Sequence, residues 1–89
     1  MLRESDIERT CSAFAKALGW LTYKFVSPSN RGVPDRIFIK GGRIVFVEFK
    51  APYKKPTKLQ ESVISKMRAA GCEVYVCDSV ESFRNALSI

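Results

Sequence analysis

A carboxylate and a lysine stand where a packed interior would hold neither. Residues 44–49 are apolar except for Glu48, so a carboxylate lies within what should be a core strand. Burying an unpaired carboxylate is costly enough that the group usually shifts its pKa, finds a partner or binds a metal. Strand alternation places Glu48 and Lys50 on one face of this strand and Val47 and Phe49 on the other. The pattern therefore indicates a chemical site on the Glu48 face.

A predicted β-hairpin brings a second carboxylate to the same place. Gly41-Gly42 lies between two apolar runs, which is a strong hairpin signal, and a turn at these glycines makes Asp35 face Glu48. Facing residues have Cβ atoms roughly 4.5–5.5 Å apart, and like charges directly opposite destabilise a sheet. Two carboxylates beside a lysine are instead suited to hold a hard cation such as Mg²⁺. The alternative is that Asp35 only begins a strand and Glu48 only pairs with Lys50, which leaves their opposition unexplained.

Glu8 and Gln60 each allow two interpretations. Ser5 to Glu8 has the S-x-x-E form of a helix capping box, and Thr57 to Gln60 has the related T-x-x-Q form. A capping role alone would account for both residues. On the helical period, Glu8 also lies about 85° from the centre of the apolar face, at the rim of the core. From there it could reach a site on the sheet, so spacing alone leaves cap and ligand roles open.

The hydrophobic pattern predicts the elements that position these residues, in the order α-β-β-β-α-β-α. We predict strands at 20–26, 35–39, 44–50 and 72–77, and a loop at 27–34. Helices are predicted between Ser5 and Gly19, between Thr57 and Gly71, and after a cap at Asp78 or Ser79. Their apolar positions are Ile7, Cys11, Phe14, Ala15 and Leu18 in the first helix, Leu59, Val63, Met67 and Ala70 in the second, and Val80, Phe83 and Leu87 in the third.

This order predicts an α/β fold in which a mixed four-stranded sheet is flanked by helices. An antiparallel meander followed by a right-handed β-α-β crossover produces such a sheet, and a short helix ends the chain. The 89 residues suffice for one modest core, so we predict a single domain over 1–89.

The amino-acid composition indicates which classes of molecule the protein can bind and where in the cell it is expected. The formal charge of +6 favours a polyanionic partner, while the absence of histidine makes a familiar zinc site hard to assemble. The three cysteines have no CxxC spacing and apolar neighbours, so we predict reduced core residues. No apolar run approaches the roughly 20 residues of a membrane span, and the charged N-terminus is unlike a signal peptide. We therefore expect a cytoplasmic protein.

Basic and polar residues near the predicted site are candidates for DNA contacts, because phosphate contacts supply affinity without reading sequence. For the cluster Lys54-Lys55-Pro56, the alternative is an ordinary solvated turn. The candidates are Asn30, Arg31, Arg36, Tyr53, Lys54, Lys55 and Lys58.

Pro34-Asp35 followed by Glu48-Phe49-Lys50 resembles the PD-(D/E)xK signature of the restriction-endonuclease-like nucleases. With Gly32 to Asp35, a glutamate on the preceding helix and a glutamine opening the next, the chain resembles the VRR-Nuc family over nearly its whole length. The resemblance implies the αβββαβ core of that superfamily and a nuclease that uses Mg²⁺ or Mn²⁺. It also implies the site residues: Asp35, Glu48 and the main-chain carbonyl of Phe49 as metal ligands, Lys50 assisting the nucleophile, and Glu8 and Gln60 completing the site.

The function predicted from these features is a metal-dependent DNA endonuclease, selective for branched DNA such as Holliday junctions. The resemblance to junction-resolving enzymes further implies a homodimer with two active sites, and Glu8 as the extra ligand if a second metal binds. One alternative is a flap or nicking nuclease of the same family. The other is a non-catalytic basic module, which would not account for Asp35, Glu48 and Glu8, because these carboxylates repel phosphate without a metal.

Overall fold

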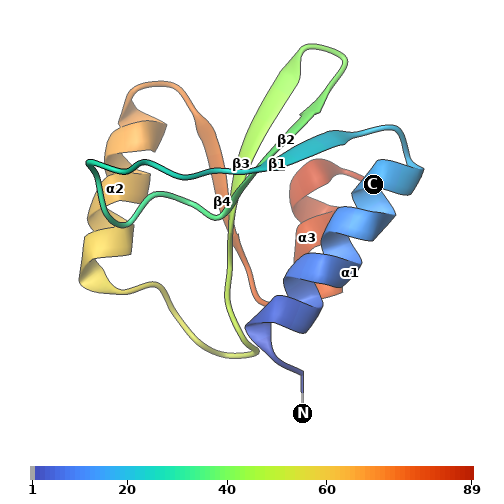
Figure 1. The fold of residues 1–89 in the computed structure, drawn as a ribbon, viewed down its shortest axis with the longest axis horizontal. Helices are drawn as coiled ribbons and strands as arrows, with labels where there is room; N and C mark the ends of the chain where they lie inside the picture. The colour runs from blue at the N-terminus through green and yellow to red at the C-terminus, as the bar shows by residue number, and fades with distance from the viewer. Residues whose placement is uncertain (1) are drawn as a thin grey trace.

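The computed structural model describes residues 2–89 and confirms the predicted α/β fold (Figure 1). Four strands form one sheet in the order β1-β2-β3-β4, with α1 and α3 on one side and α2 on the other. The predicted element order is correct. The first and last predicted strands are too long by three residues and one residue, and the two hairpin strands have the predicted length but are shifted by one residue. The elements are α1 (Glu4–Ala17), β1 (Leu21–Lys24), β2 (Arg36–Lys40), β3 (Arg43–Phe49), α2 (Lys58–Ala69), β4 (Glu73–Cys77) and α3 (Val80–Leu87).

The sheet is mixed, as predicted. Strands β1, β2 and β3 are antiparallel, and β4 runs parallel to β3 after the crossover through α2. The predicted hairpin register is confirmed, because Ile39 pairs with Ile44 and Arg36 pairs with Val47. Gly41 and Gly42 have φ of 58° and 81°. A two-residue hairpin turn of this kind needs positive φ at both positions, which glycine adopts without steric cost.

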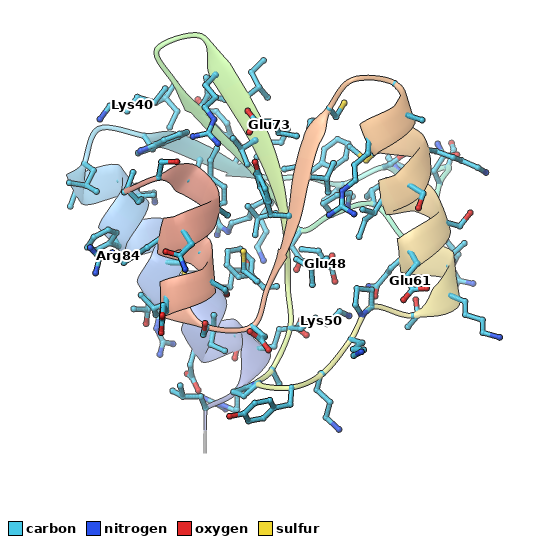
Figure 2. All side chains as sticks on the ribbon, turned by 180° about the vertical axis from the view of Figure 1, so that it is seen from behind. Lys40, Glu48, Lys50, Glu61, Glu73 and Arg84 are labelled. Atoms are coloured by element: carbon cyan, nitrogen blue, oxygen red, sulfur yellow. The ribbon has the colours of Figure 1, made fainter. Side chains whose placement is uncertain are left out.

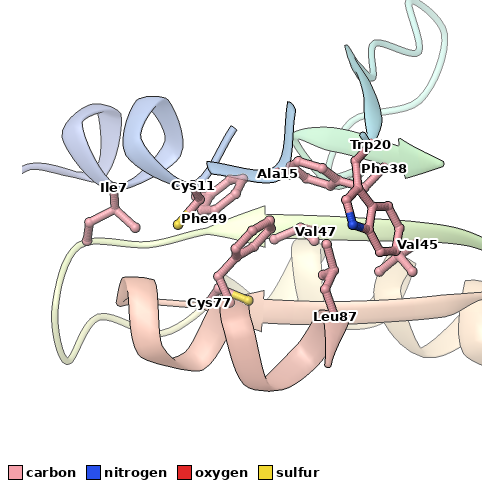
Figure 3. Close-up of a cluster of buried hydrophobic side chains, with 11 residues drawn as sticks. Ile7, Cys11, Ala15, Trp20, Phe38, Val45, Val47, Phe49, Cys77 and Leu87 are labelled. Carbon is pink, nitrogen blue, oxygen red and sulfur yellow. The ribbon is translucent and has the colours of Figure 1, made fainter. Parts of the chain in front are cut away.

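The core lies between the sheet and the pair α1 and α3 (Figure 3). Alternate residues of the hairpin, including Phe38, Val45 and Val47, have no exposed surface. They meet Ile7, Cys11 and Ala15 from α1 and Phe83 and Leu87 from α3, which are also buried. Burying apolar surface at roughly 25 cal/mol per Å² makes this layer the main source of stability.

The predicted start of α1 is wrong. The helix begins at Glu4 with Arg3 as its N-cap residue, and the Arg3 N–H donates to Asp6 Oδ2 at 3.1 Å. Asp6, rather than Glu8, therefore takes the carboxylate position of the cap, and it also pairs with the side chains of Arg3 and Arg9. Ser5 caps nothing here. Leu18, predicted on the apolar face, is 42% exposed because the helix ends at Ala17.

The cap of α2 is correct, but its predicted apolar face is not the buried one. Thr57 Oγ1 accepts from the Gln60 N–H at 3.2 Å, and the Thr57 N–H donates to Gln60 Oε1 at 2.9 Å. The residue that α2 buries is Ile64, while Leu59 on the predicted face is 51% exposed. Helix α2 packs mainly against β4, the far strand of the sheet, which draws Ile64 inward and turns the predicted stripe toward the loop after β1.

Two further predictions are settled by the fold. Ser79 caps α3, since its Oγ accepts from the Ser82 N–H at 3.0 Å. Within residues 2–89 all three cysteines are free, but Cys72 is only half-buried, so the predicted core position is wrong for this residue. Burial raises the pKa of Cys11 to about 11 and of Cys77 to about 12. In the same part of the chain, no helix combines the length and the apolar character needed to cross a membrane.

Candidate active site

Glu48 is a buried carboxylate with an incomplete set of partners. Its side chain is 2% exposed and points away from the core toward α2 (Figure 2). Oε2 lies 3.2 Å from Lys50 Nζ and accepts from Gln60 Nε2 at 3.0 Å. Among the described residues, Oε1 has no hydrogen-bond partner. A buried oxygen left in this state costs free energy, and such groups in native structures usually serve a function.

Asp35 lies beside Glu48, as the hairpin register predicts. It immediately precedes β2, one residue beyond the Arg36–Val47 pair that ends the ladder. Asp35 Oδ2 accepts a hydrogen bond from the Phe49 N–H at 2.8 Å, which fixes the carboxylate against the next residue of β3. Here strand pairing gives way to side-chain-to-backbone bonding, and the site begins at this end of the sheet.

Both carboxylates have raised pKa values. Burial, then the nearby charge of Asp35, raises the pKa of Glu48 to about 7, although Lys50 opposes the shift. Burial is also the largest cause of the raised pKa of Asp35, where the Phe49 hydrogen bond opposes it and the charge of Glu8 adds to it. The mutual repulsion of these two groups is the expected result of placing like charges face to face.

The two carboxylates fit a divalent cation. Hard cations take carboxylate oxygens, and the unpartnered Glu48 Oε1 is a buried acceptor that lacks a donor. A cation between Asp35 and Glu48 would favour the ionised form of both carboxylates and so oppose the effect of burial on their pKa values. Within residues 2–89, however, no three side chains of the types His, Cys, Asp and Glu are grouped closely enough to hold a metal. Any further ligands would be main-chain oxygens, water or a rearranged Glu8.

Glu8 lies at the edge of this site in an ion-pair cluster. Its Oε2 accepts from Arg36 Nε at 2.7 Å and also pairs with Lys24 Nζ. Burial opposes ionisation of Glu8, but the hydrogen bonds from Lys24 and Arg36 outweigh it and lower its pKa. Glu8 is near enough to Asp35 for its charge to raise the pKa of that residue. The capping alternative for Glu8 is excluded, while its predicted role as metal ligand and catalytic residue stays a prediction.

Gln60 caps α2 and also contacts Glu48, while its predicted role in catalysis stays a prediction. Its Oε1 completes the capping box with Thr57, and its Nε2 donates to Glu48. The cap therefore fixes the orientation of the amide, so that its NH₂ group faces the buried carboxylate. Thr57 was predicted only as a cap, and its position in the chain gives no sign that it orients a site residue.

The predicted DNA contacts fall into three groups. Asn30 and Arg31 are exposed on the loop beside α2, and Lys54, Lys55 and Lys58 are exposed after β3, together with Tyr53. Arg36 is different, because its side chain is only 18% exposed and is engaged by Glu8 and Thr22.

The structure adds basic residues that sequence reasoning missed. A cleft of about 380 Å³ beside α1 contains Glu8 and four cationic side chains, of which Arg9, Lys16 and Lys24 were not predicted. Sequence spacing could not place Lys24 in this cleft, because β1 and β2 are joined by a long loop and not by a tight turn. Their register, which pairs Lys24 with Arg36, could not be derived from spacing.

Comparisons with known proteins agree with this fold. No protein-family model matches the chain. The chain is 44% identical over 80 residues to the protein named "Putative nuclease p44" of Acyrthosiphon pisum secondary endosymbiont phage 1, covering 89% of this chain and 86% of that protein. A solved structure described as "VRR_NUC domain" superposes with a TM-score of 0.88 and 26% identity, covering 99% of this chain and 97% of the other. The fold is that of the restriction-endonuclease-like nucleases, and within this class the chain belongs to the VRR-Nuc family.

Proposed function

We propose that the protein is a divalent-metal-dependent endonuclease that hydrolyses phosphodiester bonds in DNA, with branched DNA such as Holliday junctions as its preferred substrate. The observation that carries the proposal is the pair Asp35 and Glu48. Asp35 is half-buried, Glu48 is buried, and both carboxylates have raised pKa values. Among the described residues, Glu48 Oε1 has no hydrogen-bond donor. A site built only for stability would not hold two carboxylates in this state.

A divalent cation, Mg²⁺ or Mn²⁺, held by Asp35, Glu48 and the Phe49 carbonyl would supply Lewis-acid charge that activates water and offsets charge on the phosphate. Lys50, 3.2 Å from Glu48, places an ammonium at the same site. There it would orient the attacking water and stabilise the charge that develops on the phosphate oxygens. Gln60 would hold Glu48 in one rotamer through its Nε2 donor.

Glu8 would contribute once the Lys24 and Arg36 side chains turn toward DNA phosphates. In the structure these two cations neutralise its carboxylate. A phosphate backbone that takes over their charges would leave Glu8 as an acceptor beside Asp35, available to a water or a second cation. The cationic residues Arg31, Lys54, Lys55 and Lys58 would hold the DNA near the site without reading its sequence.

A homodimer is the assembly we propose, because paired cuts in a junction need two active sites and a two-fold symmetric dimer supplies them. The decisive experiment compares cleavage of a four-way junction, a 5′ flap, single-stranded DNA and linear duplex, each with Mg²⁺ and with EDTA. Mg²⁺-dependent cleavage that is fastest on a branched substrate is expected. DNA binding without cleavage of any substrate would favour the second candidate, a non-catalytic basic module.

Lys50 provides a specific check of the chemistry. Lys50→Arg keeps the positive charge but replaces a compact ammonium by a planar guanidinium, so we expect a rate far below that of wild type. Full activity in this variant would reduce Lys50 to a generic positive charge.

A further inference from the structure

We propose that the groove between α2 and the loop that leads into Asp35 binds one unpaired base of the DNA strand being cut. This inference rests on the proposed nuclease function and adds a substrate feature to it. The groove has a volume of about 570 Å³, within the range typical of small-molecule sites. It is formed where the predicted apolar stripe of α2 is left without a partner in the core.

The floor of the groove is apolar and partly aromatic. It consists of Phe25 and Val33 from the loop side and Leu59, Val63 and Met67 from α2. None of these five side chains is fully buried, and Leu59 is 51% exposed. Bases stack on aromatic side chains and pack on aliphatic ones, whatever their sequence, because every base has a flat apolar face.

The rim of the groove is cationic and hydrogen-bonding. Arg31 and Lys66 line it together with Asn30 and Ser29, and no acidic side chain of the described residues does so. This charge complements the phosphates on either side of a base that enters. It also disfavours a second copy of the chain as the occupant, because a two-fold contact would bring Arg31 and Lys66 close to their own symmetry mates.

Three residues link the lining of the groove to the carboxylate site. The Phe25 N–H donates to the Asp35 carbonyl at 2.8 Å. The Phe25 ring packs on Phe46, at 5.3 Å between centroids, and Phe46 lies two residues before Glu48 on the same face of β3. Leu59 directly precedes Gln60, whose amide contacts Glu48. A strand whose phosphate reached Asp35 and Glu48 would thus bring a neighbouring base to the groove.

The loop is held in place without a ligand. Gly32 has φ of 85°, and a Cβ there would come within 3.1–3.2 Å of Leu59 and Val63. Asn30 contacts Ser27 twice, through its N–H at 3.2 Å to the carbonyl and through Nδ2 at 3.1 Å to Oγ. The close approach at Gly32 and these two bonds fix the loop against α2, so the groove is formed before DNA binds.

The test measures how binding depends on single bases. A duplex DNA with a single-stranded arm is made as a series in which each nucleotide at and near the junction is replaced by an abasic residue that keeps its phosphate. Affinity is measured by fluorescence anisotropy in the Glu48→Gln background to prevent cleavage. We expect one position at which loss of the base weakens binding about 5- to 100-fold, the range that stacking on an aromatic side chain supplies.

Groove variants should remove this dependence. Leu59→Ala shortens an exposed side chain of the groove, and Phe25→Leu keeps an apolar side chain but removes the ring. Each variant should bring the ratio of the affinity for intact DNA to the affinity for abasic DNA toward one. Leu21→Ala, which changes a 56% exposed leucine on β1 outside the groove, is the matched control and should leave the ratio unchanged. Equal affinities for all abasic and intact DNAs, or a ratio unaffected by both groove variants, would overturn the inference.

Two other outcomes separate the possibilities further. If Leu59→Ala turns a dimer into a monomer without changing the base dependence, the groove is a protein interface and the inference fails. If wild type cuts DNA with Mg²⁺ but shows no base dependence, the groove fails while the nuclease stands. If binding depends on the base but the protein cuts no DNA, the base-binding groove stands and the proposed nuclease function fails.

Discussion

The two faces of the central sheet use the same strands for opposite purposes. Toward α1 and α3, Val45, Val47 and Phe49 have no exposed surface and belong to the apolar core cluster. Toward α2, the intervening residues are Phe46, which is half-buried, and Glu48, a buried carboxylate. Alternation along one strand therefore separates a closed apolar face from an open face that carries charge.

This difference shows how a small chain can hold an unfavourable charge arrangement. Burial and the repulsion from Asp35 together raise the pKa of Glu48 and oppose folding with an ionised Glu48 in the absence of metal. The closed face on the other side of the same residues fixes the backbone, so the carboxylates cannot separate by bending the strand. Cores are close-packed and resist such shifts. In the proposed mechanism the open face would carry the reacting groups, and the closed face would keep their backbone rigid.

The largest effect should come from removing the charges of the open face. Asp35→Ala and Glu48→Gln should each lower the DNA cleavage rate about 100- to 1,000-fold or more, because the cation and its electrostatic stabilisation are lost. Without metal, Glu48→Gln should unfold no more easily than wild type, since the repulsion is relieved, whereas Asp35→Ala also loses the hydrogen bond from the Phe49 N–H. Turnover per folded molecule measures the loss of cleavage, and thermal unfolding in EDTA measures the stability without metal. A variant that cuts at nearly the wild-type rate would show that the site is elsewhere.

The closed face should show the opposite response. Phe38→Ala removes a fully buried ring that packs on Phe83, at 5.0 Å between centroids, and should lower the free energy of unfolding by about 3–5 kcal/mol. Phe38→Leu should cost less and keep the turnover of folded molecules. Urea unfolding and cleavage assays on the two variants give the comparison. A large loss of turnover in folded Phe38→Leu would mean that the two faces are not separate.

The pH dependence of stability should distinguish the faces as well. The pKa of Glu48 is raised from 4.5 to about 7, so folding favours the protonated form. The stability linked to this group is therefore fully present below about pH 4.5 and is lost as pH rises through 7. The loss is on the order of 3 kcal/mol, since one pKa unit corresponds to about 1.4 kcal/mol.

Urea unfolding of metal-free protein at pH 5 and pH 8 measures this loss, with Glu48→Gln as the control that lacks the titrating group. The wild type should be less stable at pH 8 relative to pH 5, and the variant should show a smaller difference. Equal pH dependence in the two proteins would mean that Glu48 is not held near Asp35 in the free protein.

Much of the closed face could be predicted from the sequence, because alternation and the Gly41-Gly42 turn fix the hairpin register by local rules. The same register placed Asp35 beside Glu48 without knowledge of the fold. Two features could not be obtained in this way. The start of α1 depends on which of two nearby carboxylates reaches back to the chain, and Asp6 competes successfully with Glu8.

The buried face of α2 depends on tertiary packing. The stripe that includes Leu59 and Val63 has correct helical spacing, but the helix crosses over β4 and buries Ile64 instead. Spacing identifies which residues share a face, and it does not say which face meets the sheet. The pairing of Lys24 with Arg36 was hidden for a similar reason, since the long loop between β1 and β2 leaves their register free.

The smallest predicted effect compares two capping boxes, one at each face. Gln60 at the start of α2 and Ser82 at the start of α3 occupy the same third position, and each accepts a hydrogen bond from the N–H of its cap residue. Gln60→Ala and Ser82→Ala should therefore each cost about 0.5–2 kcal/mol of stability. Only Gln60 also contacts Glu48, so only Gln60→Ala should lower turnover, by roughly tenfold for one hydrogen bond to a charged group. Because that bond favours the ionised carboxylate, its loss should also move the midpoint of the pH–stability curve upward. Equal turnover in the two variants, at matched fractions of folded protein, would leave Gln60 as a cap alone and assign the orientation of Glu48 to Lys50.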